Sequence, residues 1–211
     1  MVDRQLRSRG LTDERVLAAM AGVPRERFVR KDLIDRAYDD DALPIEGGQS
    51  ISQPYIVAWM TELLRVEPGM AVLEIGTGSG YQAAVLAAMG AQVWTLERLP
   101  DLAVAARERI AGLSFADRVT VVVADGSLGD PERAPHARII VTAGAPNLPD
   151  PLLDQLAEGG RLVIPVGPSG EQQLVLVTRE AGRLVERQVG ACAFVPLIGA
   201  AGYRPGDPGP V

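Results

Sequence analysis

The feature that most constrains the fold is the stretch Val72–Tyr81, in which an apolar run leads directly into three glycines at alternate positions. Glycines at that place let the backbone turn sharply and let a ligand approach the main chain closely. A helical run, residues 81–89, follows at once, and the first turn of a helix offers free N–H groups. The stretch therefore predicts a ligand site lined by backbone, with a purely structural strand-to-helix turn as the alternative.

The spacing of the glycines and the carboxylate after the next strand narrow the chemistry of the ligand. Dinucleotide-binding loops have the spacing G-x-G-x-x-G/A, whereas residues 76–80 have G-x-G-x-G. The observed spacing suits the amino-acid end of S-adenosylmethionine, whose carboxylate and ammonium groups need backbone donors and acceptors. Glu97 stands about 20 residues further on, where a carboxylate can accept both ribose hydroxyls. Its alternative is a surface position paired with Arg98.

Apolar runs alternate with helical periodicity through the middle of the chain. Such runs predict a parallel sheet covered on both faces, and three runs linked by turns near the end predict antiparallel strands. We expect a doubly wound, mostly parallel α/β sheet with helices on both faces and antiparallel C-terminal strands. The predicted strands are 70–75, 91–96, 119–123, 139–141, 161–165, 174–178, 183–188 and 191–197, and the predicted helices include one from Pro54 and others over 81–89, 101–111 and 149–157.

A length of 211 residues predicts one domain, over residues 1–203. Within it we expect N-terminal helices and a covering segment (1–53), a cofactor-binding α/β core (54–168) and antiparallel strands (169–203). Thr12 is the expected N-cap of the first helix. The Pro/Gly-rich tail, 204–211, is predicted to be disordered.

Composition excludes several classes of protein. The single Cys192 cannot form an internal disulfide, and with the single His136 it cannot build a Cys/His zinc site, so no metal is expected. We expect Cys192 to be buried and His136 to be solvated. No apolar run approaches the ~18 residues of a membrane span, and no apolar signal core begins the chain, so a cytoplasmic location is expected. The net charge of −6 argues against a nucleic-acid partner.

Two further polar stretches follow predicted strands. Asp125-Gly126 comes after the third strand, where an Asp can accept an adenine amino hydrogen, although Asp-Gly is also an ordinary turn. Thr142 comes after the fourth strand. The carboxyl ends of parallel strands form the expected ligand edge of such a sheet. We therefore expect these residues to lie close to the glycine loop.

Taken together, these stretches resemble the protein-L-isoaspartate (D-aspartate) O-methyltransferases, over residues 1 to about 199. The glycine loop marks class I methyltransferases in general, whereas Ser-Ile-Ser-Gln-Pro (50–54) and Phe-Val-Pro-Leu (194–197) are specific to this family. The resemblance is carried by residues 13–17, 23–29, 50–54, 73–81, 96–98, 139–145, 159–167 and 194–197.

The resemblance implies a seven-stranded, Rossmann-like methyltransferase fold. It also implies methyl transfer from S-adenosylmethionine to the free carboxylate of L-isoaspartyl residues in damaged proteins, with D-aspartyl residues as further candidate acceptors. The ester then collapses to a succinimide, whose hydrolysis returns some normal aspartate. By position, Ser52 matches the active-site serine, Glu97 the ribose ligand, and Asp125 with Gly126 the adenine contact. The implied cofactor set is Ser50, Ile51, Gly76, Gly78, Gly80, Glu97, Asp125, Gly126 and Thr142, and the implied substrate set is Ile51, Ser52, Val195, Pro196 and Leu197.

The residues are sufficient for this chemistry. The acceptor carboxylate is already ionised at pH 7, so it needs no general base. The sulfonium donor is activated before it binds, which leaves positioning and the exclusion of water to the protein. The Ser52 hydroxyl can donate a hydrogen bond to the acceptor and orient it. Its alternative role is the N-cap of the helix that begins near Pro54.

Three positions depart from the usual pattern of the family. Ala124 stands where Gly is common, Ala137 where Asp is usual, and Ala193 where Arg is frequent. The third bears on substrate binding, if that Arg helps to hold an anionic peptide. Two other functions stay open at this point: a methyltransferase for another substrate class, such as RNA or a small molecule, and a catalytically weak binder of damaged peptides. We expect a monomer without a membrane partner.

Overall fold

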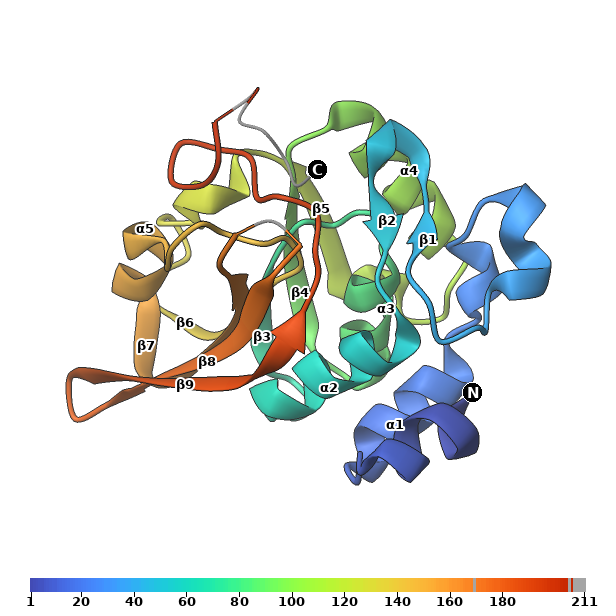
Figure 1. Cartoon of the computed structure of the whole chain (residues 1–211), viewed down its shortest axis with the longest axis horizontal. Helices are drawn as coiled ribbons and strands as arrows, with labels where there is room; N and C mark the ends of the chain where they lie inside the picture. Colours follow the sequence, from blue (N-terminus) through green and yellow to red (C-terminus); the bar gives the residue numbers. More distant parts are fainter. Residues whose placement is uncertain (169, 205, 207–211) are drawn as a thin grey trace.

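A computed structural model describes residues 1–168, 170–204 and 206, and its centre is a seven-stranded sheet with the order β5-β4-β3-β6-β7-β8-β9 (Figure 1). β3 to β7 are parallel to one another, and β8 and β9 are antiparallel additions at one edge. This confirms the predicted fold class. The strands are β3 (Ala71–Ile75), β4 (Gln92–Glu97), β5 (Val119–Val123), β6 (His136–Val141), β7 (Leu156–Val166), β8 (Gln172–Glu180) and β9 (Arg183–Cys192).

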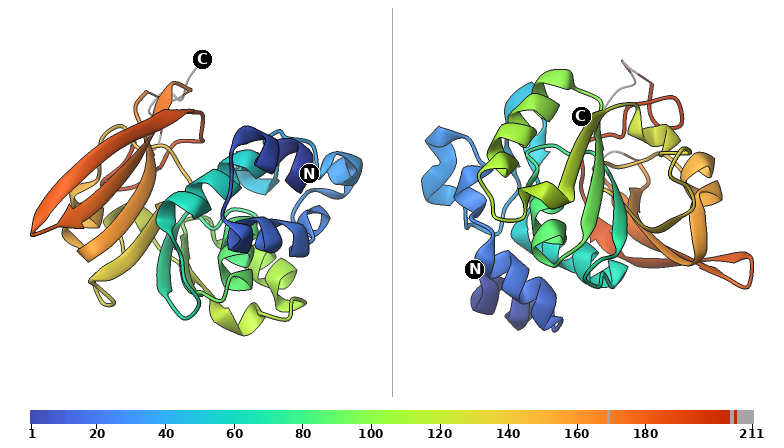
Figure 2. Two further views of the ribbon diagram at one scale, coloured as in Figure 1. Left: turned by 90° about the horizontal axis from the view of Figure 1, so that it is seen from below. Right: turned by 180° about the vertical axis from the view of Figure 1, so that it is seen from behind.

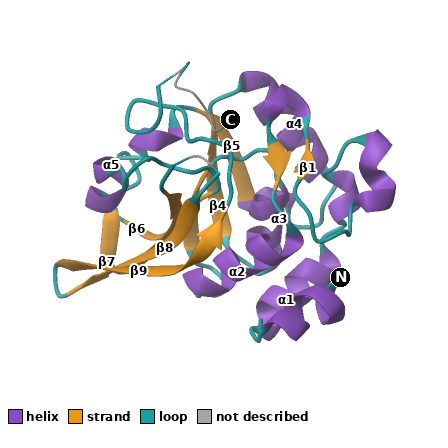
Figure 3. Ribbon diagram, viewed as in Figure 1, coloured by secondary structure: helices purple, strands orange, loops and turns teal. Residues whose placement is uncertain are grey.

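Helices cover both faces of the sheet, as Figures 2 and 3 show. Side chains of α2, α3 and α4 pack on one face, and α5 packs on the other. The predicted helix over 149–157 is shorter than expected, because β7 already begins at Leu156. The helices are α1 (Glu14–Gly22), α2 (Pro54–Leu64), α3 (Tyr81–Ala88), α4 (Pro100–Ala111) and α5 (Asp150–Asp154). In the described ranges, none is long and apolar enough to cross a membrane.

Two hydrophobic clusters fill the space between the sheet and its covering elements. Successive strand residues point to opposite faces, so Val163 belongs to the cluster beneath α2 and α3, while its neighbours Leu162 and Ile164 belong to the cluster beneath α5. All three are fully buried. Burial on both faces explains why the strands read as near-continuous apolar runs.

The N-terminal residues form short helical turns and α1, which packs against α2 and α3. The predicted N-cap, Thr12, is wrong. Asp13 caps α1, because its side chain accepts the backbone N–H of Arg15 at 2.9 Å. The backbone N–H of Thr12 instead donates to Glu62 on α2, also at 2.9 Å. A contact with a distant helix therefore decides where α1 begins.

Two short strands, β1 (Leu43–Pro44) and β2 (Ser50–Ile51), pair antiparallel to each other next to α4. They form a small sheet of their own, separate from the central one. The segment that carries Ser50 and Ser52 is thereby held at its first two residues by a hydrogen-bonded ladder.

The C-terminal prediction of three strands is wrong. β9 continues as one strand from Arg183 to Cys192, across the place where a turn between 183–188 and 191–197 was predicted, and it includes Gly190. Glycine is needed there because an added Cβ would lie 2.7 Å from the ring of Trp59. The stretch 193–197 lies outside the strands and is joined to the sheet region by a bridge from Pro196 to Gly144 and by hydrogen bonds between Phe194 and Gln172 of β8. The tail predicted to be disordered lies, except for Arg204 and Gly206, outside the described residues.

The expectation that His136 is solvated is also wrong. Its side chain is buried at the start of β6, with 8% exposure. The Nε2–H group donates to the carbonyl of Asp130 at 2.9 Å, and its backbone N–H donates to Gln155 at 2.8 Å. These two bonds satisfy the Nε2–H and the backbone N–H of His136 inside the protein. Cys192 is half-buried, and burial raises the pKa of its thiol to about 11.

Candidate active site

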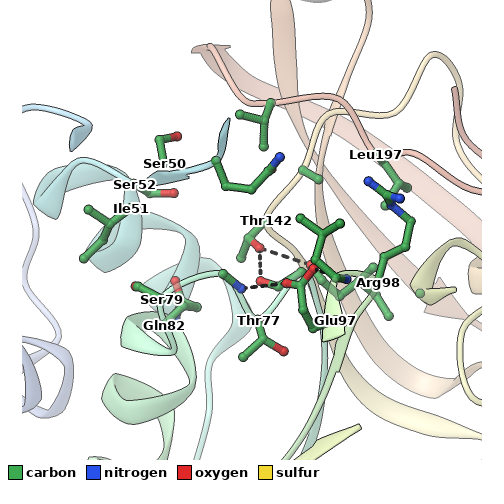
Figure 4. A pocket seen from close by; sticks show the side chains of 18 of the residues that line it. Ser50, Ile51, Ser52, Thr77, Ser79, Gln82, Glu97, Arg98, Thr142 and Leu197 are labelled. Atoms are coloured by element: carbon green, nitrogen blue, oxygen red, sulfur yellow. Dashed lines mark hydrogen bonds between the residues drawn. The ribbon is translucent and has the colours of Figure 1, made fainter. Parts of the chain in front are cut away.

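A cavity opens at the carboxyl ends of β3, β4 and β6, the edge of the sheet where the sequence predicted a ligand site (Figure 4). Ser50, Ile51 and Ser52 lie on one side of it, and Glu97 and Arg98 lie across from them. The predicted residues that the structure brings together in its lining are Ser50, Ile51, Ser52, Gly76, Gly78, Glu97, Gly126, Thr142, Val195, Pro196 and Leu197.

Gly76 lets the end of β3 approach β6 closely. Its φ is +93°, a left-handed conformation that favours glycine. A Cβ at this position would lie 2.6 Å from the hydroxyl oxygen of Thr142. That hydroxyl donates to the carbonyl of Gly76 at 2.5 Å and to that of Ile75 at 3.1 Å. The loop is therefore fixed against β6 at its first residue.

Gly78 and Gly80 differ in what surrounds them. A Cβ on Gly78 would meet only the end of Ile45, at 3.9 Å, so the backbone of Gly78 is open to the cavity. A Cβ on Gly80 would lie 2.9 Å from the side chain of Ile110 on α4. Gly80 does not line the cavity. The third glycine of the motif thus allows α3 and α4 to pack together, a role that the motif does not reveal.

Glu97 ends β4 and is buried, with 7% exposure. Its carboxylate accepts the backbone N–H of Gly78 at 2.9 Å and that of Leu99 at 3.0 Å. The alternative interpretation, that Glu97 is a surface residue paired with Arg98, is therefore wrong. Each carboxylate oxygen accepts one bond and keeps a further lone pair. The side chain can thus accept hydroxyl groups from a ligand while it stays bonded to the glycine loop.

Ser52 lies where the first cavity meets a second one of about 490 Å³. The two cavities share Ser50, Ser52, Thr142 and Val195. The N-cap position of α2 is Gln53, and the first-turn N–H of Tyr55 donates to the side chain of Asp40 at 3.1 Å, so the interpretation of Ser52 as an N-cap is wrong. Within the described part of the chain, the Ser52 hydroxyl has no hydrogen-bond partner. It is free to bond a molecule at the junction.

Asp125 does not line the cavity, although its neighbour Gly126 does. Its carboxylate accepts the N–H of Ser127 at 3.0 Å and the N–H of Ala200 at 2.8 Å. Burial alone would raise the pKa of Asp125, but these donors outweigh it and hold the pKa below its usual range. Asp125 thus fastens the turn that follows Val195–Leu197 to the end of β5.

Glu74 is a buried carboxyl group that the sequence analysis did not single out. It lies in β3, fully buried, and neither of its oxygens has a partner among the described residues. Burial raises its pKa to about 8. The sequence feature that could have identified it is a single Glu inside an otherwise apolar predicted strand. A buried carboxylate without a partner is strongly disfavoured, so the surroundings of Glu74 favour its protonated form.

Further lining residues come from the glycine loop and the start of α3. Their closeness in sequence to the glycine motif could have identified them as lining residues. The Thr77 hydroxyl hydrogen-bonds that of Thr95 at 2.7 Å, which ties the loop to β4. Gln82 donates to the hydroxyl of Thr61 on α2 at 2.9 Å. The lining residues that the sequence analysis missed include Thr77, Ser79, Tyr81, Gln82, Arg98 and Leu99.

The three departures from the family pattern lie in different places. Ala193 is exposed and lines the second cavity, so it bears on whatever binds there. Ala137 is exposed near the start of β6, away from both cavities. Ala124 donates its backbone N–H to the carbonyl of Glu97 at 3.0 Å, a bond that any residue except proline can make.

The doubly wound sheet and a cavity over its glycine loop define a class I S-adenosylmethionine-dependent methyltransferase. The sequence model of the family protein-L-isoaspartate(D-aspartate) O-methyltransferase (PCMT) matches residues 1–202. A protein-L-isoaspartate O-methyltransferase of Methanoculleus marisnigri is 53% identical over 204 residues, which covers 97% of this chain and 92% of that protein. One of Koribacter versatilis is 51% identical over 205 residues, with 97% and 92% covered.

A solved structure gives the same result at lower identity. A protein-L-isoaspartate O-methyltransferase of Plasmodium falciparum, in complex with S-adenosyl-L-homocysteine, has a TM-score of 0.80 and 27% identity to this chain. The match covers 92% of this chain and 95% of that one. The chain therefore belongs to the protein-L-isoaspartate(D-aspartate) O-methyltransferase family.

Proposed function

We propose that Ser52 orients the acceptor carboxylate in the methylation of L-isoaspartyl residues, the S-adenosylmethionine-dependent reaction that goes with membership of this family. The observation that carries the proposal is the hydroxyl of Ser52, which has no partner in the described residues and lies where the two cavities meet. A hydroxyl donates one hydrogen bond to a carboxylate at little desolvation cost. Ile51 and Val195–Leu197 frame the acceptor beside it.

On the cofactor side, Gly76 and Gly78 bind the methionine end, Glu97 accepts the ribose hydroxyls, and Gly126 with Asp125 contacts the adenine. The open backbone at Gly78 and the spare lone pairs of Glu97 support this assignment. Ser50, Ile51 and Thr142 line the same cavity and complete the set. For Gly80 the support is indirect, because it shapes the loop through its packing against α4.

S-adenosylmethionine supplies an activated methyl group when it is bound. The protein needs no general base, because the acceptor carboxylate is ionised at neutral pH. Ser52 directs one oxygen of the acceptor toward the cofactor side of the cavity, and the apolar residues Ile51 and Leu197 limit the access of water. Orientation of this kind supplies several kcal/mol in related reactions.

The proposal also covers the location, the oligomeric state and the substrate range of the protein. We expect the protein to be cytoplasmic and monomeric. We also expect one domain over residues 1–203, because strands from the middle and from the end of the chain belong to one sheet. A net charge of −6 makes a nucleic-acid substrate unfavourable. The proposed substrate range also includes D-aspartyl residues.

Transfer of an isotopically labelled methyl group tests the function. The purified chain is incubated with labelled S-adenosylmethionine and one of four acceptors: an L-isoaspartyl peptide, its L-aspartyl twin, its D-aspartyl twin, or tRNA. We expect label on the isoaspartyl peptide and none on the L-aspartyl peptide or the tRNA. Label on tRNA would instead favour a nucleic-acid methyltransferase, and binding of the isoaspartyl peptide without transfer would favour a catalytically weak binder.

A further inference from the structure

Arg25 is a fully buried arginine in the short helical turn Arg25–Arg27, with 0% exposure. Within the described residues, no carboxylate lies at ion-pair distance from it, and its Nη1 has no hydrogen-bond partner. A buried guanidinium is costly unless its donors are bonded, and apolar residues of similar volume are often at least as stabilising. The position of this charge therefore calls for an explanation beyond packing.

The donors of Arg25 connect segments that are far apart in the sequence. Nε donates to the carbonyl of Ala37, and Nη2 donates to the carbonyl of Ser52, both at 2.8 Å. The guanidinium lies over the ring of Tyr81, 4.8 Å from its centroid. Tyr81 begins α3 directly after the glycine loop and lines the first cavity. One side chain thus links the segment of Ser52 to the helix on the cofactor side.

Ser52 has few other contacts that fix it. The β1–β2 ladder ends at Ile51, one residue earlier, and the hydroxyl of Ser52 is unpartnered in the described chain. Within the described residues, the hydrogen bond from Arg25 is the polar contact that holds the carbonyl of Ser52 itself, while Asp40 holds the following turn through Gln53 and Tyr55. Tyr81 also packs against Phe28, and the two rings meet edge-on with their centroids 5.4 Å apart. Arg25 relates Ser52 to a firmly packed part of the cofactor side.

We propose that Arg25 is a positioning residue for methyl transfer, which sets Ser52 at the junction of the two cavities by holding its carbonyl against α3. The inference rests on the proposed role of Ser52. A misplacement of about 1 Å in a reacting arrangement can cost on the order of 100-fold in rate. Arg25 acts through the placement of Ser52 and does not itself touch the acceptor.

The test is a double-mutant cycle between Arg25→Lys and Ser52→Ala. Lysine keeps the charge, but it has no planar fork with which to bond both carbonyls. We expect Arg25→Lys to lower kcat about 10-fold, and to lower it less than about twofold further in the Ser52→Ala background. The Kd for S-adenosylhomocysteine should stay within about twofold. The inference would be overturned if Arg25→Lys lowered kcat equally in both backgrounds. It would also be overturned if Arg25→Lys lowered kcat while Ser52→Ala alone left kcat unchanged.

Arg179→Lys is the matched control. Arg179 also donates through Nε and Nη2 to two carbonyls, those of Leu156 and Leu153, at 2.8 and 2.7 Å. It lies outside the lining of both cavities. We expect Arg179→Lys to lower the melting temperature and to leave kcat at the wild-type value. A fall in kcat that matches that of Arg25→Lys would show that any lost arginine–carbonyl pair slows the enzyme.

A structural measurement separates this inference from the proposed function. In a crystal structure of the Arg25→Lys variant, the carbonyl of Ser52 should be displaced while Tyr81 keeps its place, and an undisplaced Ser52 would overturn the inference. Absence of methyl transfer by the unmodified chain would contradict the proposed function alone, and the position of Ser52 in the variant would still decide the role of Arg25. If Arg25→Lys does not fold, Arg25→Gln, which removes the buried charge and keeps an amide donor, is measured in the same way.

Discussion

The cofactor side and the acceptor side of the cavity differ in how their polar groups are held. On the cofactor side, Glu97 is bonded to two backbone N–H groups and Gly76 is locked against Thr142. On the acceptor side, the hydroxyl of Ser52 is unpartnered in the described chain, and residues 193–197 lie outside the strands. The cofactor side is thus organised by neighbouring strand ends, whereas the acceptor side depends on a few contacts from distant segments.

Removal of Glu97 should have the largest effect, and on cofactor binding. In Glu97→Ala the two charge-assisted hydrogen bonds to the ribose are lost, so affinity for S-adenosylhomocysteine should fall by roughly 2–4 kcal/mol. Isothermal titration calorimetry measures the loss. Glu108→Ala, which removes an exposed carboxylate from α4, is the control and should bind normally. Normal binding by Glu97→Ala would remove this residue from the site.

A pair of glycine variants tests whether the cofactor side is rigid. Gly76 and Gly69 have similar positive φ values, +93° and +83°, but a Cβ would meet Thr142 at the first and nothing within 4 Å at the second. Gly69→Ala should cost about 1 kcal/mol in free energy of unfolding, for backbone strain alone. Gly76→Ala should cost about 1–3 kcal/mol more, because a packed group must move. Equal midpoints in urea would show that the loop yields easily.

Ser52→Ala tests the acceptor side. We expect the variant to fold, to bind S-adenosylhomocysteine with unchanged affinity, and to turn over an isoaspartyl peptide at least about 10-fold more slowly, a loss of ~1.4 kcal/mol. Ser52→Thr keeps the hydroxyl and should retain more of the activity than the alanine variant. A lower melting temperature with wild-type turnover would instead point to a structural role for Ser52.

Glu74→Gln should change the pH dependence of stability rather than binding or turnover, by a slope of at most about 1.4 kcal/mol per pH unit. The pKa of Glu74 is raised to about 8 in the folded chain, above its usual value. Between those two values the folded state holds a proton that the unfolded state has released, so stability falls as pH rises. Glu74→Gln should remove that part of the slope between pH 5 and 8. An identical slope in both proteins would mean that the carboxyl group is partnered in solution.

Local sequence was sufficient for the parts of the molecule that depend on neighbouring residues. The apolar runs gave the central sheet, and the motif from Val72 to Tyr81 gave the cavity edge, because strand ends of a parallel sheet meet by topology. What depends on distant partners was missed. Thr12 bonds Glu62 rather than capping α1, and Gly190 marks the approach of Trp59 rather than a turn.

The site shows the same division. Glu97 was found because it follows a strand, but its bonds to the glycine loop were not foreseeable from spacing. The buried Glu74 was hidden inside an apolar run, and Arg25 was hidden because nothing in its neighbourhood reveals that it reaches Ser52. Gly80 belongs to the motif, yet the packing of Ile110 explains why it is glycine.

The identity of the acceptor is the central claim, and the fate of the transferred methyl group tests it most directly. Methylation of an isoaspartyl carboxylate gives an ester, which the following backbone nitrogen attacks, with expulsion of methanol and closure of a succinimide. Labelled peptide should therefore release its label as volatile methanol under mild base. The aspartyl twin should carry no label from the start. Label that survives base, or equal labelling of the aspartyl twin, would contradict the account.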